Sequence, residues 1–171
     1  MKERLIKYLI CPKCYGDVQI SKPYTANGDG EIKQGLINCT ECRSRWQIKD
    51  YIPRFITEKN YASSFGYQWN KHRTSQLDSI NGLQISHERF FKETKWPQNM
   101  EGSLMLEAGC GAGRFTEIAL KTGAEVFSFD YSSSVDACLE NIGLSENFHI
   151  IQADIYNMPF KKGHPNYITE E

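Results

Sequence analysis

The chain has 171 residues, of which 40% are apolar and 12% aromatic, and its formal net charge is −1 at pH 7. This composition can build a packed core and excludes a disordered chain, while the near-neutral charge excludes a global field that draws the protein to nucleic acid or membrane. No apolar stretch approaches the roughly 20 residues that span a bilayer, and the start lacks a signal-peptide cleavage site, so we expect a cytoplasmic protein.

Residues 1–56 have the pattern of a small β unit. Segments 17–21, 31–38 and 45–56 are strand candidates, and the Asn- and Gly-containing stretch 26–30 supplies a turn between the first two. This part holds 10 Lys/Arg and 6 Asp/Glu, a net charge of +4, whereas residues 57–171 have a net charge of −5. The basic excess could contact an anionic partner, although such an excess is usually a solvated surface.

Four cysteines in this part form two C-x-x-C pairs separated by 24 residues: Cys11, Cys14, Cys39 and Cys42. Each pair can place two thiolates on one metal ion, and two pairs complete the S₄ set that Zn²⁺ prefers. The alternatives are disulfides, which a reducing cytoplasm disfavours, and redox-active pairs, which would need a surrounding βαβ unit. We predict a structural zinc ion with no open coordination position.

An aromatic-rich segment, residues 57–102, follows, with a helix expected over 86–95 and Ser86 as its N-cap. From residue 103 the pattern becomes β-α-β-α-β, with strands at 104–107, 125–130 and 149–152 and helices near 113–122 and 133–144. Strands that alternate with helices of this length predict a parallel sheet with right-handed crossovers. We therefore predict an α/β chain with a zinc-binding β unit in 1–56, a lead-in in 57–102 and a Rossmann-like part in 103–171.

Three glycines, Gly109, Gly111 and Gly113, form a turn directly after the first strand of this part. Glycine there lets a ligand approach the backbone closely. Arg114 follows Gly113, so the dinucleotide fingerprint G-x-G-x-x-G is not matched, and the G-x-x-x-x-G-K-[ST] phosphate loop is absent. Cys110, inside the turn, and Cys138, in the second helix, are interpreted as small buried residues.

Carboxylates end the three strands. Asp130 can accept hydrogen bonds from ribose hydroxyls, and Asp154 can accept one from an adenine amino group, with Ile155 and Met158 as apolar walls. Glu107 could reach the amino end of a ligand directly or through water. The alternative for Asp130 and Asp154 is a role as strand-end caps.

The segments "LEAGCGAGRF", the strand ending at Asp130 and "QADIYNMPF" resemble the successive motifs of class I S-adenosylmethionine-dependent methyltransferases. The resemblance implies a seven-stranded Rossmann-like sheet and S-adenosyl-L-methionine as cofactor. It assigns the cofactor site to Glu107, Gly109, Gly111, Gly113, Asp130, Tyr131, Asp154 and Ile155.

The front part resembles the zinc ribbon fused to many bacterial methyltransferases and the zinc-binding activator subunits of tRNA and translation-factor methyltransferases. "FGYQWNKHRTSQLDS" resembles the aromatic lead-in of such fused enzymes. There, Tyr67 and Trp69 are candidates for a cover over the cofactor or for plain packing residues.

Only the first three strands of the family's sheet are expected here, because the end, "HPNYITEE", departs from the usual fourth-strand motif. The first strand would then be an exposed apolar edge, which a partner chain could cover. We accordingly expect a fragment, a frame-shifted product or a truncated form of a longer enzyme, with little or no activity of its own.

The predicted function is methyl transfer to a small molecule, such as a sugar or a lipid-linked intermediate. Two alternatives stay open: an RNA methyltransferase, favoured by the basic front part, and a non-catalytic zinc-ribbon partner protein. The first would need Lys13, Lys22, Lys33, Arg43, Arg45 and Arg54 on one face. The catalytic base is not indicated.

Overall fold

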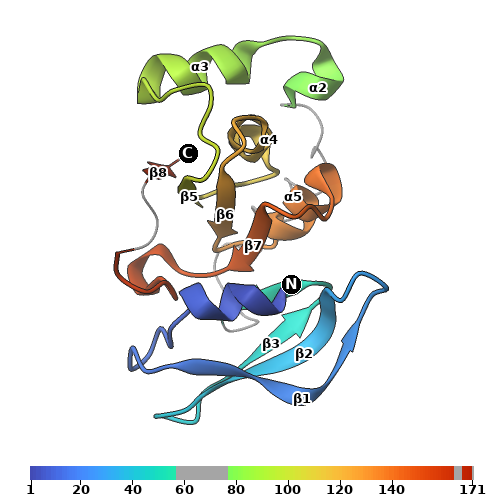
Figure 1. Cartoon of the computed structure of the whole chain (residues 1–171), viewed down its shortest axis with the longest axis vertical. Coiled ribbons are helices and arrows are strands. Elements are labelled where there is room, and N and C mark those ends of the chain that lie inside the picture. The colour runs from blue at the N-terminus through green and yellow to red at the C-terminus, as the bar shows by residue number, and fades with distance from the viewer. Residues whose placement is uncertain (57–76, 164–166, 171) are drawn as a thin grey trace.

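The computed structural model describes residues 1–56, 77–163 and 167–170. An eight-stranded mixed sheet in the order β1-β2-β3-β4-β7-β6-β5-β8 runs through these residues. Figure 1 has the N-terminal strands at the bottom, the parallel strands in the middle and helices α2 and α3 at the top. The α/β class with a Rossmann-like parallel sheet is confirmed, whereas the boundaries after residues 56 and 102 stay predictions.

The N-terminal unit is an antiparallel meander of β1 (Val18–Ala26), β2 (Ile32–Cys39), β3 (Arg45–Lys49) and β4 (Ile52–Arg54). The single strand expected over 45–56 is wrong, because Asp50 and Tyr51 adopt left-handed φ values of 51° and 70° and reverse the chain. A 3-10 helix, η1 (Glu3–Tyr8), precedes the meander and was not predicted.

The parallel part follows the predicted β-α-β-α-β order, with β5 (Leu104–Ala108), β6 (Glu125–Asp130) and β7 (Phe148–Gln152) side by side. Their crossover helices are α4 (Arg114–Lys121) and α5 (Ser134–Ile142). The short 3-10 helix η2 (Ile155–Asn157) follows β7. The sequence placed all these strands and helices within a few residues, because strand and helix periodicities alternate cleanly there.

A fourth parallel strand, β8 (Tyr167–Glu170), pairs with β5, with Met105 opposite Tyr167 and Ala108 opposite Glu170. The expectation of only three strands is therefore wrong, and so is that of an open edge at β5. The segment was missed because it is short and follows Pro165, without the long apolar run that marks a central strand.

The two faces of the parallel strands have different covers. Residues such as Met105 and Val126 face α4, and Phe148 and Ile150 face α5. The alternate residues Leu106, Phe127, Phe129 and Ile151 share one apolar cluster with the N-terminal unit, which contributes Leu5, Leu9, Ile37, Trp46 and Phe55. The N-terminal unit therefore takes the place of a helix layer on this face of the sheet.

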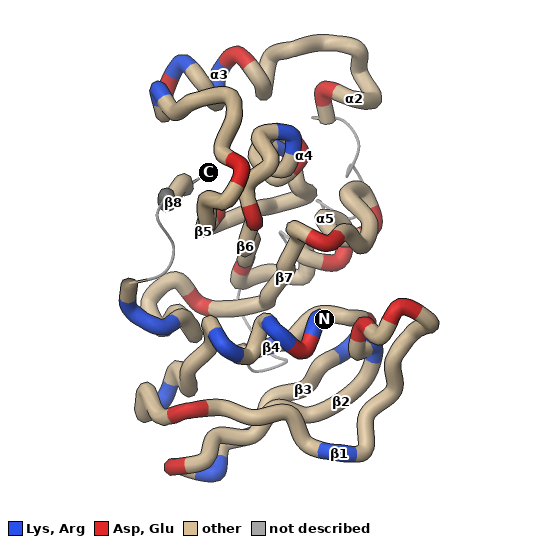
Figure 2. The backbone as a smooth tube through the Cα atoms, viewed as in Figure 1, with Lys and Arg blue, Asp and Glu red and all other residues tan. Residues whose placement is uncertain are grey.

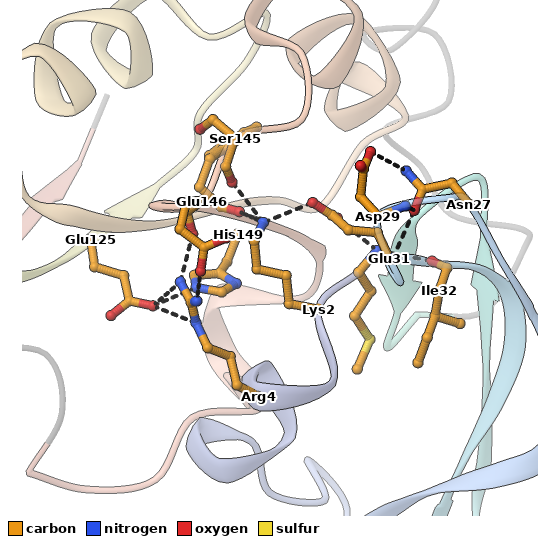
Figure 3. A network of polar contacts seen from close by, with 12 residues as sticks. Lys2, Arg4, Asn27, Asp29, Glu31, Ile32, Glu125, Ser145, Glu146 and His149 are labelled. Carbon is orange, nitrogen blue, oxygen red and sulfur yellow. Dashed lines mark hydrogen bonds and ion pairs between the residues drawn. The ribbon is translucent and has the colours of Figure 1, made fainter.

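Polar contacts fasten η1 to the amino-end edge of the parallel strands (Figure 3). Lys2 Nζ donates to Glu31 Oε1 at 2.9 Å and to the Ser145 carbonyl at 2.6 Å. Arg4 pairs with Glu125 and Glu146, and Glu125 Oε1 also lies 2.7 Å from His149 Nε2. The interface between the two parts is consequently both apolar and charged.

The described part of the lead-in is helical: α2 (Asp78–Asn81) and α3 (Ile85–Thr94). Phe90 of α3 packs on Phe115 of α4, with ring centroids 6.0 Å apart. Ser86 is not the N-cap, which is Gln84. The Ser86 amide donates instead to the Asp78 carboxylate at 3.1 Å. Across the described ranges, no helix has the length and apolar character that would cross a bilayer.

Candidate functional site

The carboxyl ends of β5, β6 and β7 meet at one edge of the sheet, as the parallel order requires. The glycine turn follows Ala108, Asp130 ends β6, and Asp154 comes just after β7. Asp130 pairs with Gln152 in the strand register, and its carbonyl accepts the Ala153 amide at 3.0 Å. The predicted site residues from three separate motifs are thus brought together at this edge.

Hydrogen bonds tie the glycine turn to β6. The amides of Gly109 and Cys110 donate to the Phe129 carbonyl at 2.8 and 3.1 Å, and the Gly111 amide donates to Asp130 Oδ2 at 3.1 Å. Gly109 and Gly111 have φ values of 78° and 49°, in the left-handed region that favours glycine. The turn is therefore held in one shape by the carboxylate predicted to bind the ribose.

Asp130 is already engaged on both carboxylate oxygens. Oδ1 accepts the Ser132 amide at 2.7 Å and lies 2.8 Å from Ser132 Oγ, while Oδ2 accepts the Gly111 amide. A carboxylate offers about four acceptor positions, so these contacts leave room for about one further donor. The geometry suits one ribose hydroxyl, whereas the sequence argument allowed two.

Packing explains the glycine at position 113 without a ligand. Gly113 has a φ of 94°, and a Cβ atom there would stand 3.0 Å from Cys138 Sγ and 3.1 Å from Ile142 Cγ1. The start of α4 can approach α5 this closely only where the side chain is absent. The cofactor-binding assignment of Gly113 is untested, and the first two glycines of the turn are the better candidates for ligand contact.

Glu107 lies beneath the turn, on the helix-covered face of β5, and is only 1% exposed. Its Oε2 accepts hydrogen bonds from Thr116 Oγ1 of α4 and Ser128 Oγ of β6, both at 2.6 Å. These hydroxyls supply hydrogen bonds to one of the two oxygens of a carboxylate that is costly to bury. Glu107 thus links β5, β6 and α4 directly below the candidate cofactor turn.

The loop after β7 presents Asp154 and two apolar side chains. Asp154 caps η2 by accepting the Tyr156 amide at 2.9 Å, which is the capping role that the sequence left open. Ile155 is 44% exposed and Met158 is 39% exposed, so both are available as apolar walls. Tyr131 follows Asp130 and is half-buried. Tyr67 and Trp69 lie outside the described residues.

The four predicted metal ligands converge. Their Sγ atoms all lie within 4.8 Å of one another, with Cys11 and Cys42 at 3.6 Å and Cys14 and Cys39 at 3.4 Å. A tetrahedral site with Zn–S bonds of about 2.3 Å has S···S edges of about 3.8 Å, so the cluster is compatible with zinc. Amides of Lys13 and Glu41 donate to Cys11 Sγ and Cys39 Sγ at 3.3 Å.

The sequence missed two residues that support the site from outside. Arg54, at the end of β4, pairs with Asp136 of α5, and Gln152 connects Arg54 to the backbone of Tyr131. Arg54 lies in no motif, and Gln152, the first residue of the "QADIYNMPF" segment, was given no role there. Their roles depend on β4 joining β7 in the sheet, through the pair Arg54 and Gln152.

Comparisons with known proteins agree with this geometry. Residues 106–168 match the family model described as a methyltransferase domain. A proposed S-adenosyl-L-methionine-dependent methyltransferase from Methanococcus maripaludis has a similar fold, with a TM-score of 0.50 and 16% identity over 68% of this chain and 52% of that one. No curated protein matches the chain. The class I methyltransferase resemblance is thereby confirmed for this region, while the chain spans about half the length of the matched structure.

Proposed function

We propose, on the match of residues 106–168 to the methyltransferase-domain model, that the protein binds S-adenosyl-L-methionine at the carboxyl edge of β5, β6 and β7. The observation that carries the proposal is the turn in which the Gly111 amide contacts the Asp130 carboxylate, with Asp154 just after the next strand, β7. Asp130 accepts one ribose hydroxyl, Asp154 the adenine amino group, and Ile155 packs on the adenine ring. Gly109 and Gly111 leave space for the methionine end of the cofactor, above Glu107.

When bound, this cofactor supplies an electrophilic methyl group on sulfur. The chain's own contribution is positioning, because in-line displacement needs the donor held at a fixed distance and angle from the acceptor. The glycine turn fixes the backbone under the methionine part, and the Asp130 carboxylate fixes the ribose. Neither contact requires a catalytic base on these residues.

We further propose that Cys11, Cys14, Cys39 and Cys42 hold a structural zinc ion, with residues 1–56 as the ribbon unit, 57–102 as the lead-in and 103–171 as the cofactor-binding unit. All four positions of the ion are filled by sulfur, so it stabilises the fold and performs no chemistry. Thiolate ligands persist in a reducing compartment, which favours the cytoplasm.

We propose a small molecule as the methyl acceptor. An RNA acceptor would be favoured by a shared basic face on the N-terminal unit, but Arg54 is paired with Asp136, and Lys33 lies over the Tyr51 ring. Strand alternation puts Arg45, opposite Asn38, on the other face of β2 and β3 from Lys33. Figure 2 places the basic residues of this unit at separate points around it, which supports the small-molecule reading.

The direct test is calorimetric titration of the zinc-loaded 171-residue chain with S-adenosyl-L-methionine. Saturable 1:1 binding supports the site, and no detectable heat at millimolar cofactor would favour a non-catalytic partner protein instead. Transfer of a radiolabelled methyl group to small-molecule and RNA pools then separates the acceptor classes.

A further inference from the structure

Arg54 joins the N-terminal unit to the carboxyl edge of the parallel sheet. Its Nη2 donates to Asp136 Oδ1 at 2.6 Å, and its Nη1 donates to Gln152 Oε1 at 2.7 Å. The Arg54 side chain is 16% exposed, so the pair is partly shielded from solvent. A guanidinium in this setting holds two groups at a fixed separation through charge-assisted bonds.

Both partners of Arg54 lead to the ribose end of the proposed site. Gln152 is 4% exposed, and its Nε2 donates to the Tyr131 carbonyl at 3.1 Å, one residue after Asp130. Asp136 lies in the first turn of α5, which follows the Ser132 contact to Asp130. Arg54 therefore braces both ends of the turn that carries the ribose-binding carboxylate.

We infer that Arg54 is a positioning residue for S-adenosyl-L-methionine, through which the N-terminal unit sets the shape of the ribose-binding turn. The affinity part of this inference rests on the proposed function. Arg54 does not touch the cofactor. It acts through Gln152 and Asp136, which keep the Asp130 carboxylate directed at the edge where the glycine turn ends.

Arg4 provides a matched control, because it joins the same two parts at the opposite edge of the sheet. Its guanidinium contacts Glu125, the first residue of β6, and Glu146, just before β7 (Figure 3). Loss of Arg4 should weaken the attachment of the N-terminal unit without reaching the carboxyl edge. A comparison of the two arginines thus separates positioning of the site from general docking.

The test measures the Kd of S-adenosyl-L-methionine and the Tm for zinc-loaded wild type, Arg54→Met, Arg54→Lys and Arg4→Met. Coupling of this kind is typically about 0.5–2 kcal/mol, so Arg54→Met should raise Kd about 2- to 30-fold. Arg54→Lys should fall between it and the wild type. Arg4→Met should lower Tm with Kd unchanged. Equal Kd for Arg54→Met and wild type, or an equal loss in Arg4→Met, would overturn the inference.

Two further measurements complete the design. The double variant Arg54→Met/Asp136→Asn should bind S-adenosyl-L-methionine no more weakly than Arg54→Met alone, because the two residues act as a pair. A rise in Kd equal to the product of the two single-variant effects would contradict this. Amide hydrogen exchange of Ser132 in the cofactor-free protein should accelerate in Arg54→Met but not in Arg4→Met. This readout tests the bracing even if the wild type binds no cofactor, a result that would refute only the proposed function.

Discussion

Asp130 has a double role, because the carboxylate proposed to bind the ribose also holds the glycine turn through Gly111 and the next turn through Ser132. The turn is therefore formed before the cofactor arrives, and little reorganisation is left for the binding step. The sequence indicated Asp130 by its place at the end of a strand. It could not indicate how many hydrogen bonds the carboxylate already accepts, because these depend on the course of two loops.

Asp130→Asn should weaken S-adenosyl-L-methionine binding about 10- to 100-fold, because hydrogen bonds to a charged group contribute about 1.5–3 kcal/mol. Calorimetric titration measures the change. Ser132→Ala, which keeps the carboxylate, should change Kd less than about threefold, and Asp29→Asn in the exposed β1–β2 turn should change nothing. An unaltered Kd in Asp130→Asn would remove this residue from the site.

Gly113→Ala should destabilise the protein by about 1–3 kcal/mol, because the new Cβ meets Cys138 Sγ at 3.0 Å in a left-handed backbone. Gly102→Ala isolates the backbone effect: its φ is 78°, and no atom lies within 4 Å of the added Cβ. Urea unfolding measures the loss of unfolding free energy in both variants, and the difference between the two losses is the steric contribution at Gly113. Equal losses in the two variants would show that Gly113 is required by its dihedral angle alone.

At the scale of elements, secondary structure was predicted best where the apolar residues follow a single strand or helix period. Strands β5, β6 and β7 are runs of apolar residues between clear helices, and all three were predicted close to their observed bounds. β8 was missed and β4 was not separated from β3, because each is three or four residues long and is stabilised by its neighbour in the sheet. Helix η1 was missed for a similar reason: its buried residue Leu5 is placed by tertiary packing.

His149 of β7 links the elements at the amino edge and makes stability depend on pH. Burial lowers the pKa of His149 to about 4 despite the neighbouring Glu125, and the ring stacks on Phe127 at 4.6 Å. Between about pH 4 and the unfolded value of about 6.5, the unfolded chain binds a proton that the folded protein does not. Stability therefore rises with pH in this window and is lost as pH falls through it.

We expect the wild type to lose about 2 kcal/mol of unfolding free energy between pH 7 and pH 4.5 from this residue. His149→Phe keeps a stacked ring but cannot titrate, so the unfolding free energy of this variant should change less with pH over the same interval. Urea unfolding at several pH values measures both slopes. His87→Phe on α3 is the control, and an unchanged slope in His149→Phe would assign the pH dependence elsewhere.

On the scale of the whole molecule, the described residues share a core that crosses the predicted boundary between the zinc-binding unit and the cofactor-binding unit. Leu9, Ile37 and Trp46 from one side pack in the same cluster as Phe127 and Phe129 from the other. Cooperative unfolding follows from such a shared core, since neither side can bury its apolar face alone. The sequence suggested separate units because motif boundaries, unlike packing, are visible in it.

Removal of zinc should therefore affect the parallel sheet as well as the ribbon. Structural zinc sites contribute many kcal/mol to folding, so chelation should lower the Tm of the entire chain by at least about 10 °C in one transition. Scanning calorimetry measures the shift, and amide exchange of β3 and of β6 reports each side separately.

Cys39→Ser is the matched variant for this experiment. It should unfold at a Tm close to that of the chelated wild type and show no further change on addition of chelator, because one lost ligand opens the tetrahedral site. Two separate transitions, with the β6 amides protected as before, would contradict the shared core. In that case the parallel sheet would be stable without the zinc-binding unit.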